Sequence, residues 1–237
     1  SLERYEPLLA GRSERVLSSL PPSYLLSTPM EDMADEVKLL LAAPGRVLSR
    51  LDLADEHSRS VVTVASPGVP ETLALIAGVL ALHRIDVLAA RSYATAGGPA
   101  LTRVIVAAPE EATRPRIEGD LVAAFTGSLA VDAALAAKIK DYREPRIEPE
   151  IRVLDDASDS STVIEVRAPD ALGLLYALTA GFADLGLAIH VAKIDTLGHR
   201  VVDVFYVRTL RGAKLGAEQS DEVRRAIRHR VDRLLNG

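Results

Sequence analysis

The fold is decided by the stretch TVIEVRAPDALGLLYALTAGFADLG, residues 162–186. Its first part, Thr162–Ala168, alternates in polarity and is rich in β-branched residues, which is typical of a strand. Pro169 and Asp170 then end the strand, and Asp170 is a candidate N-cap for a following helix. From Ala171 to Leu185 apolar residues recur at steps of three and four, which predicts an amphipathic helix that ends at a glycine.

The rest of the C-terminal half extends this unit to five elements. Leu187–Thr196 and Arg200–Thr209 are two strand-like runs separated by a short turn, which predicts a hairpin. A last helix is expected over Asp221–Leu235, with Ser220 as its candidate N-cap and acidic residues in its first turn, where they complement the helix dipole. The predicted order is strand, helix, strand, strand, helix.

The chain repeats this pattern. A shift of 102 positions places Val62-Thr63-Val64 on Ile164-Glu165-Val166 without a gap. The same shift aligns the apolar stripe of the last helix in each copy, pairing Leu121, Phe125 and Leu129 with Val223, Ile227 and Val231. We therefore expect the same five elements in a first module, over Val61–Ala65, Pro70–His83, Ile85–Thr95, Leu101–Ala107 and Gly119–Tyr142.

One spare strand candidate precedes each module, Val47–Leu53 and Glu150–Leu154. Pairing with the first strand of the module that follows would cover an edge that an ordinary ferredoxin-like sheet fills with a fourth strand. We expect an α+β fold of two tandem ferredoxin-like modules (βαββα with an extra leading strand), with antiparallel sheets and helices on one face. The expected domains are residues 46–143 and 144–237. The alternative places Glu150–Leu154 in the first sheet.

Residues 1–45 form a helical linker segment of a different kind. Thr28-Pro29-Met30-Glu31 matches a capping box with proline at the first helical position. A helix is expected to begin there and to dock through an apolar face that comprises Met33, Val37, Leu40 and Leu41. The preceding Pro21–Tyr24 is typical of a turn or linker.

Composition excludes several classes of function. Of 237 residues 48% are hydrophobic, which is enough for a core, but only 4% are aromatic, which leaves few rings for stacking nucleic-acid bases. The absence of cysteine excludes disulfides, zinc thiolates and cysteine nucleophiles, and is compatible with a cytoplasmic setting. A net charge of −5 does not favour nucleic acid. No apolar stretch reaches the roughly 20 residues of a membrane span, and no signal peptide is expected.

Catalytic signatures are missing, so this chain is expected to carry no catalytic residue and no metal ligand. Gly127-Ser128 is similar to the opening of a nucleotidyltransferase site, but no Asp-x-Asp follows it, and packing within a predicted helix is the favoured role. His190, Asp195 and His199 could form a metal site. A strand end and a hairpin tip lie too far apart for two ligands of one ion, however.

The strongest candidate site is the turn Asp170–Leu175, where the strand gives way to the helix. Unpaired backbone N–H groups at a helix start can hold a carboxylate. Gly173 allows a ligand to approach the backbone, and Asp170 offers a negative charge for an ammonium group. A free amino acid carries both groups on one carbon and would suit this turn. The alternative is that Asp170 only caps the helix and Gly173 only permits close packing.

Around this turn the sequence resembles the ACT domain. The pattern is Asp170-x-x-Gly173-Leu174-Leu175, then Ile189-His190-x-Ala192-Lys193-Ile194, then Val202-Asp203-Val204-Phe205-Tyr206-Val207. The last two runs are similar to the C-terminal ACT domain of the family of PII uridylyltransferase/uridylyl-removing enzymes, some relatives of which transfer an adenylyl group. The first module departs from the pattern, because Gly68 stands in place of Asp170 and Glu71 in place of Gly173.

The resemblance implies a regulatory region that binds glutamine, or another free amino acid, between its modules. In this family the ligand controls nucleotidyltransferase and hydrolytic domains that act on the nitrogen-signalling protein PII and use a nucleoside triphosphate and Mg. Asp170 would bind the ammonium group and the nearby N–H groups the carboxylate; the side-chain amide would lie near Ile189 and His190 or near Asp86 and Val87. The expected ligand-binding residues are Asp170, Ala171, Leu172, Gly173, Leu174, Leu175, Ile189, His190, Asp86 and Val87.

The alternative function is a pairing module that mediates dimerisation and binds no small molecule. A homodimer is compatible with both hypotheses, whereas neither nucleic acid nor a membrane is an expected partner.

Overall fold

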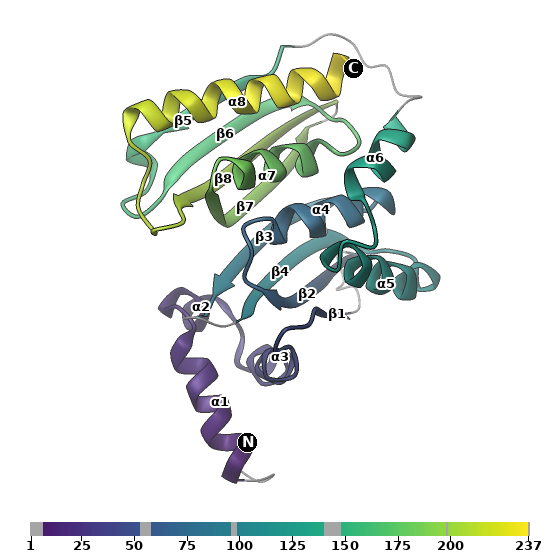
Figure 1. Ribbon diagram of the computed structural model, residues 1–237, viewed down its shortest axis with the longest axis vertical. Coiled ribbons are helices and arrows are strands. Elements are labelled where there is room, and N and C mark those ends of the chain that lie inside the picture. Colours follow the sequence, from purple (N-terminus) through teal and green to yellow (C-terminus); the bar gives the residue numbers. More distant parts are fainter. Residues whose placement is uncertain (1–6, 53–57, 96–98, 140–147, 198, 237) are drawn as a thin grey trace.

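The computed structural model describes residues 7–52, 58–95, 99–139, 148–197 and 199–236, and it forms one eight-stranded sheet with helices packed on it (Figure 1). Every pair of neighbouring strands is antiparallel, in the order β1-β2-β4-β3-β7-β8-β6-β5. The strands are β1 (Leu48–Asp52), β2 (Arg59–Pro67), β3 (Val87–Ala94), β4 (Pro99–Ala107), β5 (Glu150–Leu154), β6 (Thr162–Pro169), β7 (Leu187–Leu197) and β8 (Arg200–Thr209).

The helices fall into two groups. The modules carry α4 (Thr72–Leu82), α5 (Arg114–Phe125), α6 (Val131–Ile139), α7 (Leu174–Asp184) and α8 (Ala217–Asn236). The N-terminal segment carries α1 (Pro7–Ser19), α2 (Pro22–Ser27) and α3 (Met30–Ala42). Single turns of 3₁₀-helix lie at Glu111–Thr113 and Asp155–Ala157.

The predicted fold class is confirmed, including the extra leading strands. β1 pairs with β2, and β5 pairs with β6, so each spare strand lies on the edge left open in its own module. Glu150–Leu154 therefore belongs to the second half of the sheet and not to the first. The two predicted sheets merge into one because β3 and β7, the inner edges of the two halves, hydrogen-bond to each other.

The junction between β3 and β7 has approximate twofold symmetry. Ala90 pairs with Ala192, which is its own equivalent 102 residues later, and the flanking pairs are Ala89 with Lys193 and Arg91 with Val191. An axis between Ala90 and Ala192 therefore relates the two halves. It places the start of α7 beside the end of α4, and the start of α4 beside the end of α7.

The equivalence changes by one residue in the last strand of each module. Val104 of β4 pairs with both Val62 and Ala90. Phe205 of β8 pairs in the same way with Ile164 and Ala192. Positions in β4 and β8 therefore correspond at a separation of 101 residues, and Thr102 is the equivalent of Asp203.

The helix predicted over Gly119–Tyr142 is wrong, because the chain breaks it into α5 and α6. Gly127 adopts φ +74°, a left-handed conformation that ends a helix. Its N–H donates to the Ala124 carbonyl, and the Thr126 hydroxyl donates to the Val122 carbonyl. Gly127-Ser128 thus lies in a turn and not inside a helix. The predicted end at residues 140–142 lies outside the described residues.

The cap predicted for α8 is also wrong. The helix begins at Ala217, four residues before Asp221, and Ser220 is buried within its first turn. The residue that closes the helix start is Gln219, whose side-chain oxygen accepts a hydrogen bond from the Gly216 N–H (3.1 Å). This arrangement resembles the reciprocal half of a capping box.

α3 and Tyr24 of α2 pack on the face of the first half-sheet opposite to α4 and α5, whereas α1 packs against α3 and extends away from the sheet (Figure 1). Tyr24 is fully buried there, with its ring 5.1 Å from that of Tyr93 in an edge-on arrangement. The linker predicted at Pro21–Tyr24 is wrong, because Pro22 begins α2, which brings Tyr24 into this core. The predicted capping box is also absent from the described contacts: Pro29 is the N-cap of α3 and no side chain caps the helix.

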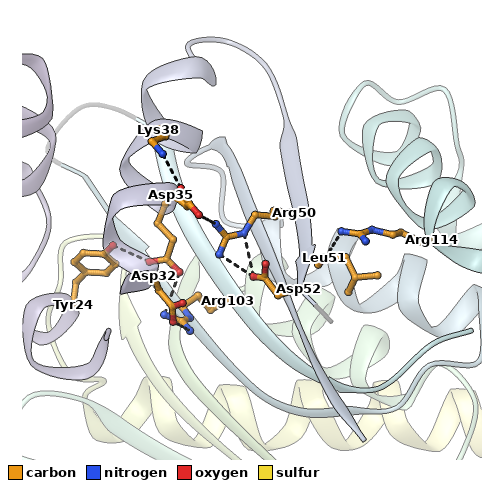
Figure 2. A network of polar contacts seen from close by, with 10 residues as sticks. Tyr24, Asp32, Asp35, Lys38, Arg50, Leu51, Asp52, Arg103 and Arg114 are labelled. Carbon is orange, nitrogen blue, oxygen red and sulfur yellow. Dashed lines mark hydrogen bonds and ion pairs between the residues drawn. The ribbon is translucent and has the colours of Figure 1, made fainter. Parts of the chain in front are cut away.

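A polar network ties these helices to the sheet (Figure 2). Glu36 of α3 is only 1% exposed and accepts a hydrogen bond from the Tyr24 hydroxyl (2.8 Å). Arg103 of β4 forms two ion pairs with α3: its Nη1 lies 3.1 Å from Glu36 Oε1, and its Nη2 lies 2.9 Å from Asp32 Oδ2. Burial raises the pKa of Glu36, which the Tyr24 hydrogen bond and the Arg103 charge oppose. The N-terminal segment is thus attached through a buried charge as well as through apolar contacts.

Candidate functional site

A cavity of about 330 Å³ lies between the two halves, a size typical of small-molecule sites. The first half contributes the end of α4 and the residues after it, Ala77, Ala81 and Arg84–Val87, together with Lys138 of α6. The second half contributes the turn Asp170–Leu175 and four strand residues, Ile194, Thr196, Val201 and Asp203. The predicted turn is therefore open to a hollow that both halves enclose.

The turn is shaped by Gly173. This residue has φ +83° and is the N-cap of α7, so the helix begins at Leu174 and Asp170 is not its N-cap. A Cβ at Gly173 would lie 3.4 Å from Ile139 Cδ1, so the position also permits close packing against α6. The Asp170 N–H donates to the His199 carbonyl (3.0 Å), which anchors the turn to the β7–β8 hairpin.

Backbone N–H groups at the start of α7 differ in what they can bind. The Leu174 N–H donates to the Ala171 carbonyl (3.0 Å), so it is already used within the turn. Leu175 and Tyr176 follow in the first turn, where an α-helix has no internal acceptor for its N–H groups. Of the N–H groups of Leu172–Leu175 that are expected to bind an anion, that of Leu174 is therefore already engaged, whereas that of Leu175 has no acceptor within the helix.

The cavity brings together most of the predicted binding residues. All of Asp170–Leu175 line it, and so do Asp86 and Val87 from the other half. Ile189 and His190 are not among its lining residues. The twofold axis explains the difference, because Ile189 is the equivalent of Val87 and lies beside the start of α4. The two sequence-based locations for the side-chain amide thus belong to two different, symmetry-related places.

Asp203 is the important lining residue that sequence reasoning did not select. Its side chain is only 1% exposed, and within the described residues its Oδ1 has no hydrogen-bond partner. Burial raises the pKa of Asp203 to about 7, and the nearby carboxylates of Asp170 and Asp195 act in the same direction. The available signal was the strand pattern: side chains two residues apart point to the same face, so Asp203 shares a face with Val201 and Phe205, which are buried.

Two basic side chains complete the charge pattern of the cavity. Lys138 lies on α6, and its ammonium group donates to the Leu82 carbonyl at the end of α4 (2.5 Å). Arg84 follows α4 directly and has a left-handed backbone, φ +55°. The acidic groups are Asp86, Asp170 and Asp203. A zwitterion therefore meets groups of both signs.

The symmetry-related place in the other half has different chemistry. Gly68 replaces Asp170, and Glu71 replaces Gly173 with a right-handed backbone, φ −76°. Thr102 replaces Asp203, and its hydroxyl lies 3.1 Å from that of Ser92. The left-handed turn and the two carboxylates are thus present in one half only.

The described residues contain no group of three or more acidic or histidine side chains placed to hold a metal ion. Burial, with the nearby Arg208, lowers the pKa of His190 and so favours its neutral form. No helix in the described ranges has the length and apolar character needed to cross a membrane.

No family model matches the chain. It is similar to the bifunctional uridylyltransferase/uridylyl-removing enzymes of Rhodopseudomonas palustris, over 224 residues, Nitrobacter winogradskyi, over 223 residues, and Nitrobacter hamburgensis, over 222 residues. Each is 30% identical over 88% of this chain. The matched part is 24% of each relative, so the chain spans about a quarter of their length. The predicted resemblance to part of the uridylyltransferase/uridylyl-removing enzymes is confirmed.

Proposed function

We propose that this chain, a homologue of part of the bifunctional uridylyltransferase/uridylyl-removing enzymes, is a tandem ACT region that senses a free amino acid, with glutamine as the first candidate. In this proposal it regulates nucleotidyltransferase and hydrolytic domains of a longer enzyme that acts on PII. Those domains would use the nucleoside triphosphate and Mg. The chain itself would supply the sensor.

The cavity between the halves is the observation that supports this proposal. The Asp170 carboxylate can accept hydrogen bonds from the ammonium group of an amino acid, and the N–H groups at the start of α7 can donate to the carboxylate of that ligand. Lys138 adds a positive charge on the opposite wall. The side chain of the ligand would then extend toward the strand residues that line the cavity, Ile194, Thr196, Val201 and Asp203.

The ligand would act by shifting a population of conformations. One wall of the cavity belongs to α4 and α6, and the other to the turn before α7. A molecule that contacts both walls stabilises the relative orientation of the two halves in which both contacts can form. Catalytic domains attached to the chain would respond to that placement, which is the coupling that an allosteric site requires.

One ligand per chain is expected. The symmetry-related place lacks the equivalents of Asp170, Gly173 and Asp203. A single asymmetric site therefore follows from the divergence of the two halves, whereas identical halves would provide two.

Calorimetric titration of glutamine into the purified chain tests the proposal. We expect a stoichiometry of one, and loss of the binding heat in Asp170→Ala because the ammonium group loses its counter-charge. Asp159→Ala, which removes an exposed acid beyond the opposite end of β6 from Asp170, is the matched control and should bind as the wild type does. Undiminished affinity in Asp170→Ala would discard this site.

The competing hypothesis, a pairing module without a ligand, has its own signature. A chain that sediments as a stable dimer and shows no thermal shift with glutamine at millimolar concentration would support it.

A further inference from the structure

We propose that Asp203 binds the side-chain carboxamide of the ligand and so lets the cavity distinguish glutamine from glutamate. This inference rests on the proposed amino-acid site. It adds a specificity-determining residue on strand β8, which lines the same cavity as the turn that would hold the ammonium and carboxylate groups.

The position of Asp203 supports this role. The residue lies in the interior of the sheet, where β8 pairs with β6 at Val166 and with β7 at Ile194. Its neighbours along the strand on the same face, Val201 and Phe205, are buried apolar side chains. The carboxyl group therefore lies among apolar surroundings and borders the cavity. A ligand that enters the cavity can reach it.

The charges around Asp203 favour its neutral form. Asp170 from the turn and Asp195 from β7 both disfavour a further negative charge, and burial disfavours it more strongly. Asp86 adds another carboxylate to the wall of the cavity, while Lys138 and Arg84 are the basic groups that line it. Near neutral pH a substantial fraction of Asp203 therefore carries a proton.

A protonated carboxyl group is complementary to a primary amide. Its O–H can donate to the amide oxygen while its C=O accepts from the amide N–H, so both groups form two hydrogen bonds at once. An ionised glutamate side chain offers two acceptors and no donor, which leaves one oxygen of Asp203 facing a like-charged or unpaired oxygen. Desolvated polar groups that lack a partner are what make such a site selective.

The unsatisfied state of the group distinguishes this role from a structural one. A buried acid that only stabilises the fold is expected to have a partner, yet within the described residues Oδ1 of Asp203 has none. Its equivalent in the first half, Thr102, has a hydroxyl partner in Ser92. Of these two equivalent residues, the one with a buried oxygen that lacks a hydrogen-bond partner among the described residues is therefore the one that borders the cavity.

Titration of glutamine and of glutamate into the full chain at pH 6, 7 and 8 tests the inference. For the wild type we expect glutamine to bind about 10- to 100-fold more tightly than glutamate at pH 8. That ratio should fall as the pH is lowered through 7 but stay above one, because the ionised Asp203 repels the glutamate carboxylate, whereas the protonated acid only leaves one of its oxygens without a donor.

Two variants separate hydrogen bonding from charge. Asp203→Asn keeps one donor and one acceptor, so glutamine should bind within about threefold of the wild type, with a preference that no longer depends on pH. Asp203→Leu removes both and should weaken glutamine by about 10- to 100-fold. Thr102→Val, at the equivalent position of the first half, should change neither affinity.

The outcomes distinguish this inference from the proposal on which it rests. Wild-type glutamine affinity and selectivity in Asp203→Leu would overturn the role of Asp203 and leave the amino-acid site standing. If Asp203→Leu does not fold, a glutamine-to-glutamate ratio that depends equally on pH in Asp203→Asn and in the wild type gives the same refutation. Absence of binding heat from the wild type with any amino acid would overturn both.

Discussion

Asp203 should make the stability of the ligand-free chain depend on pH. Burial raises its pKa from 3.8 to about 7, so between these values the folded state keeps a proton that the unfolded state has released. The stabilisation from this proton is complete below pH 3.8 and is lost as the pH rises to about 7. The difference between the two pKa values corresponds to about 4 kcal/mol in the free energy of unfolding.

Asp203→Asn should remove this dependence, because asparagine has the shape and neutrality of the protonated acid. We expect the variant to exceed the wild type in free energy of unfolding by about 2 kcal/mol at pH 5 and by about 4 kcal/mol at pH 8, with little change above pH 7. Residues that lower the stability of the fold are common at functional sites.

Urea denaturation of both proteins at pH 5, 6, 7 and 8 provides the measurement, with each free energy taken from linear extrapolation. Asp159→Asn is the matched control: it makes the same chemical change at an exposed position, and its effect should stay within about 0.5 kcal/mol at every pH. A difference between Asp203→Asn and the wild type that does not change with pH would refute the reasoning. Greater stability of the wild type at pH 8 would show that the ionised carboxylate has a stabilising partner.

Two further predictions concern the packing of α4 and of the N-terminal helices. Gly78→Ala places a Cβ 2.3 Å from Val131 Cγ1 and should lower the free energy of unfolding by about 1 to 3 kcal/mol. Gly119→Ala is the control and should not lower it, because a Cβ at Gly119 would have nothing within 4 Å. Equal urea midpoints for the two variants would contradict this prediction. Glu36→Ala leaves Arg103 without its buried partner, so amide hydrogen exchange in α1–α3 should accelerate. Exchange in α7, which lies in the other half, should stay unchanged. Unaltered exchange in α3 would show that the polar network does not hold these helices on the sheet.

The strands of each half could be predicted from the sequence because their signals are local, whereas the pairing of β3 with β7, which joins the two predicted sheets into one, was not predicted. Glu150–Leu154 pairs as expected, since an open edge beside a short apolar strand leaves few other solutions. The break between α5 and α6 could not be predicted. Phe125 and Leu129 both pack against the core, so the apolar stripe continues across Gly127 although the helix does not. Tyr24 was missed for a similar reason, because only the sheet face beneath α2 makes it a core residue.

Of the candidate site, the sequence could predict the part that lies within a single turn. Asp170–Leu175 lines the cavity as a contiguous stretch of chain. The choice between Asp86 and Ile189 depends on the register of β3 against β7, which no local pattern encodes. Asp203 and Lys138 come from a strand and a helix that only the packed structure brings to the same cavity.

The axis between Ala90 and Ala192 also bears on how a sheet built from two modules can arise. Two copies of one small module, meeting edge to edge as separate polypeptides, would form a symmetric dimer with two identical pockets. Gene duplication and fusion would retain the edge contact and remove the requirement for identity. Each pocket could then mutate alone, so that one copy became scaffold while its twin kept the acidic pair.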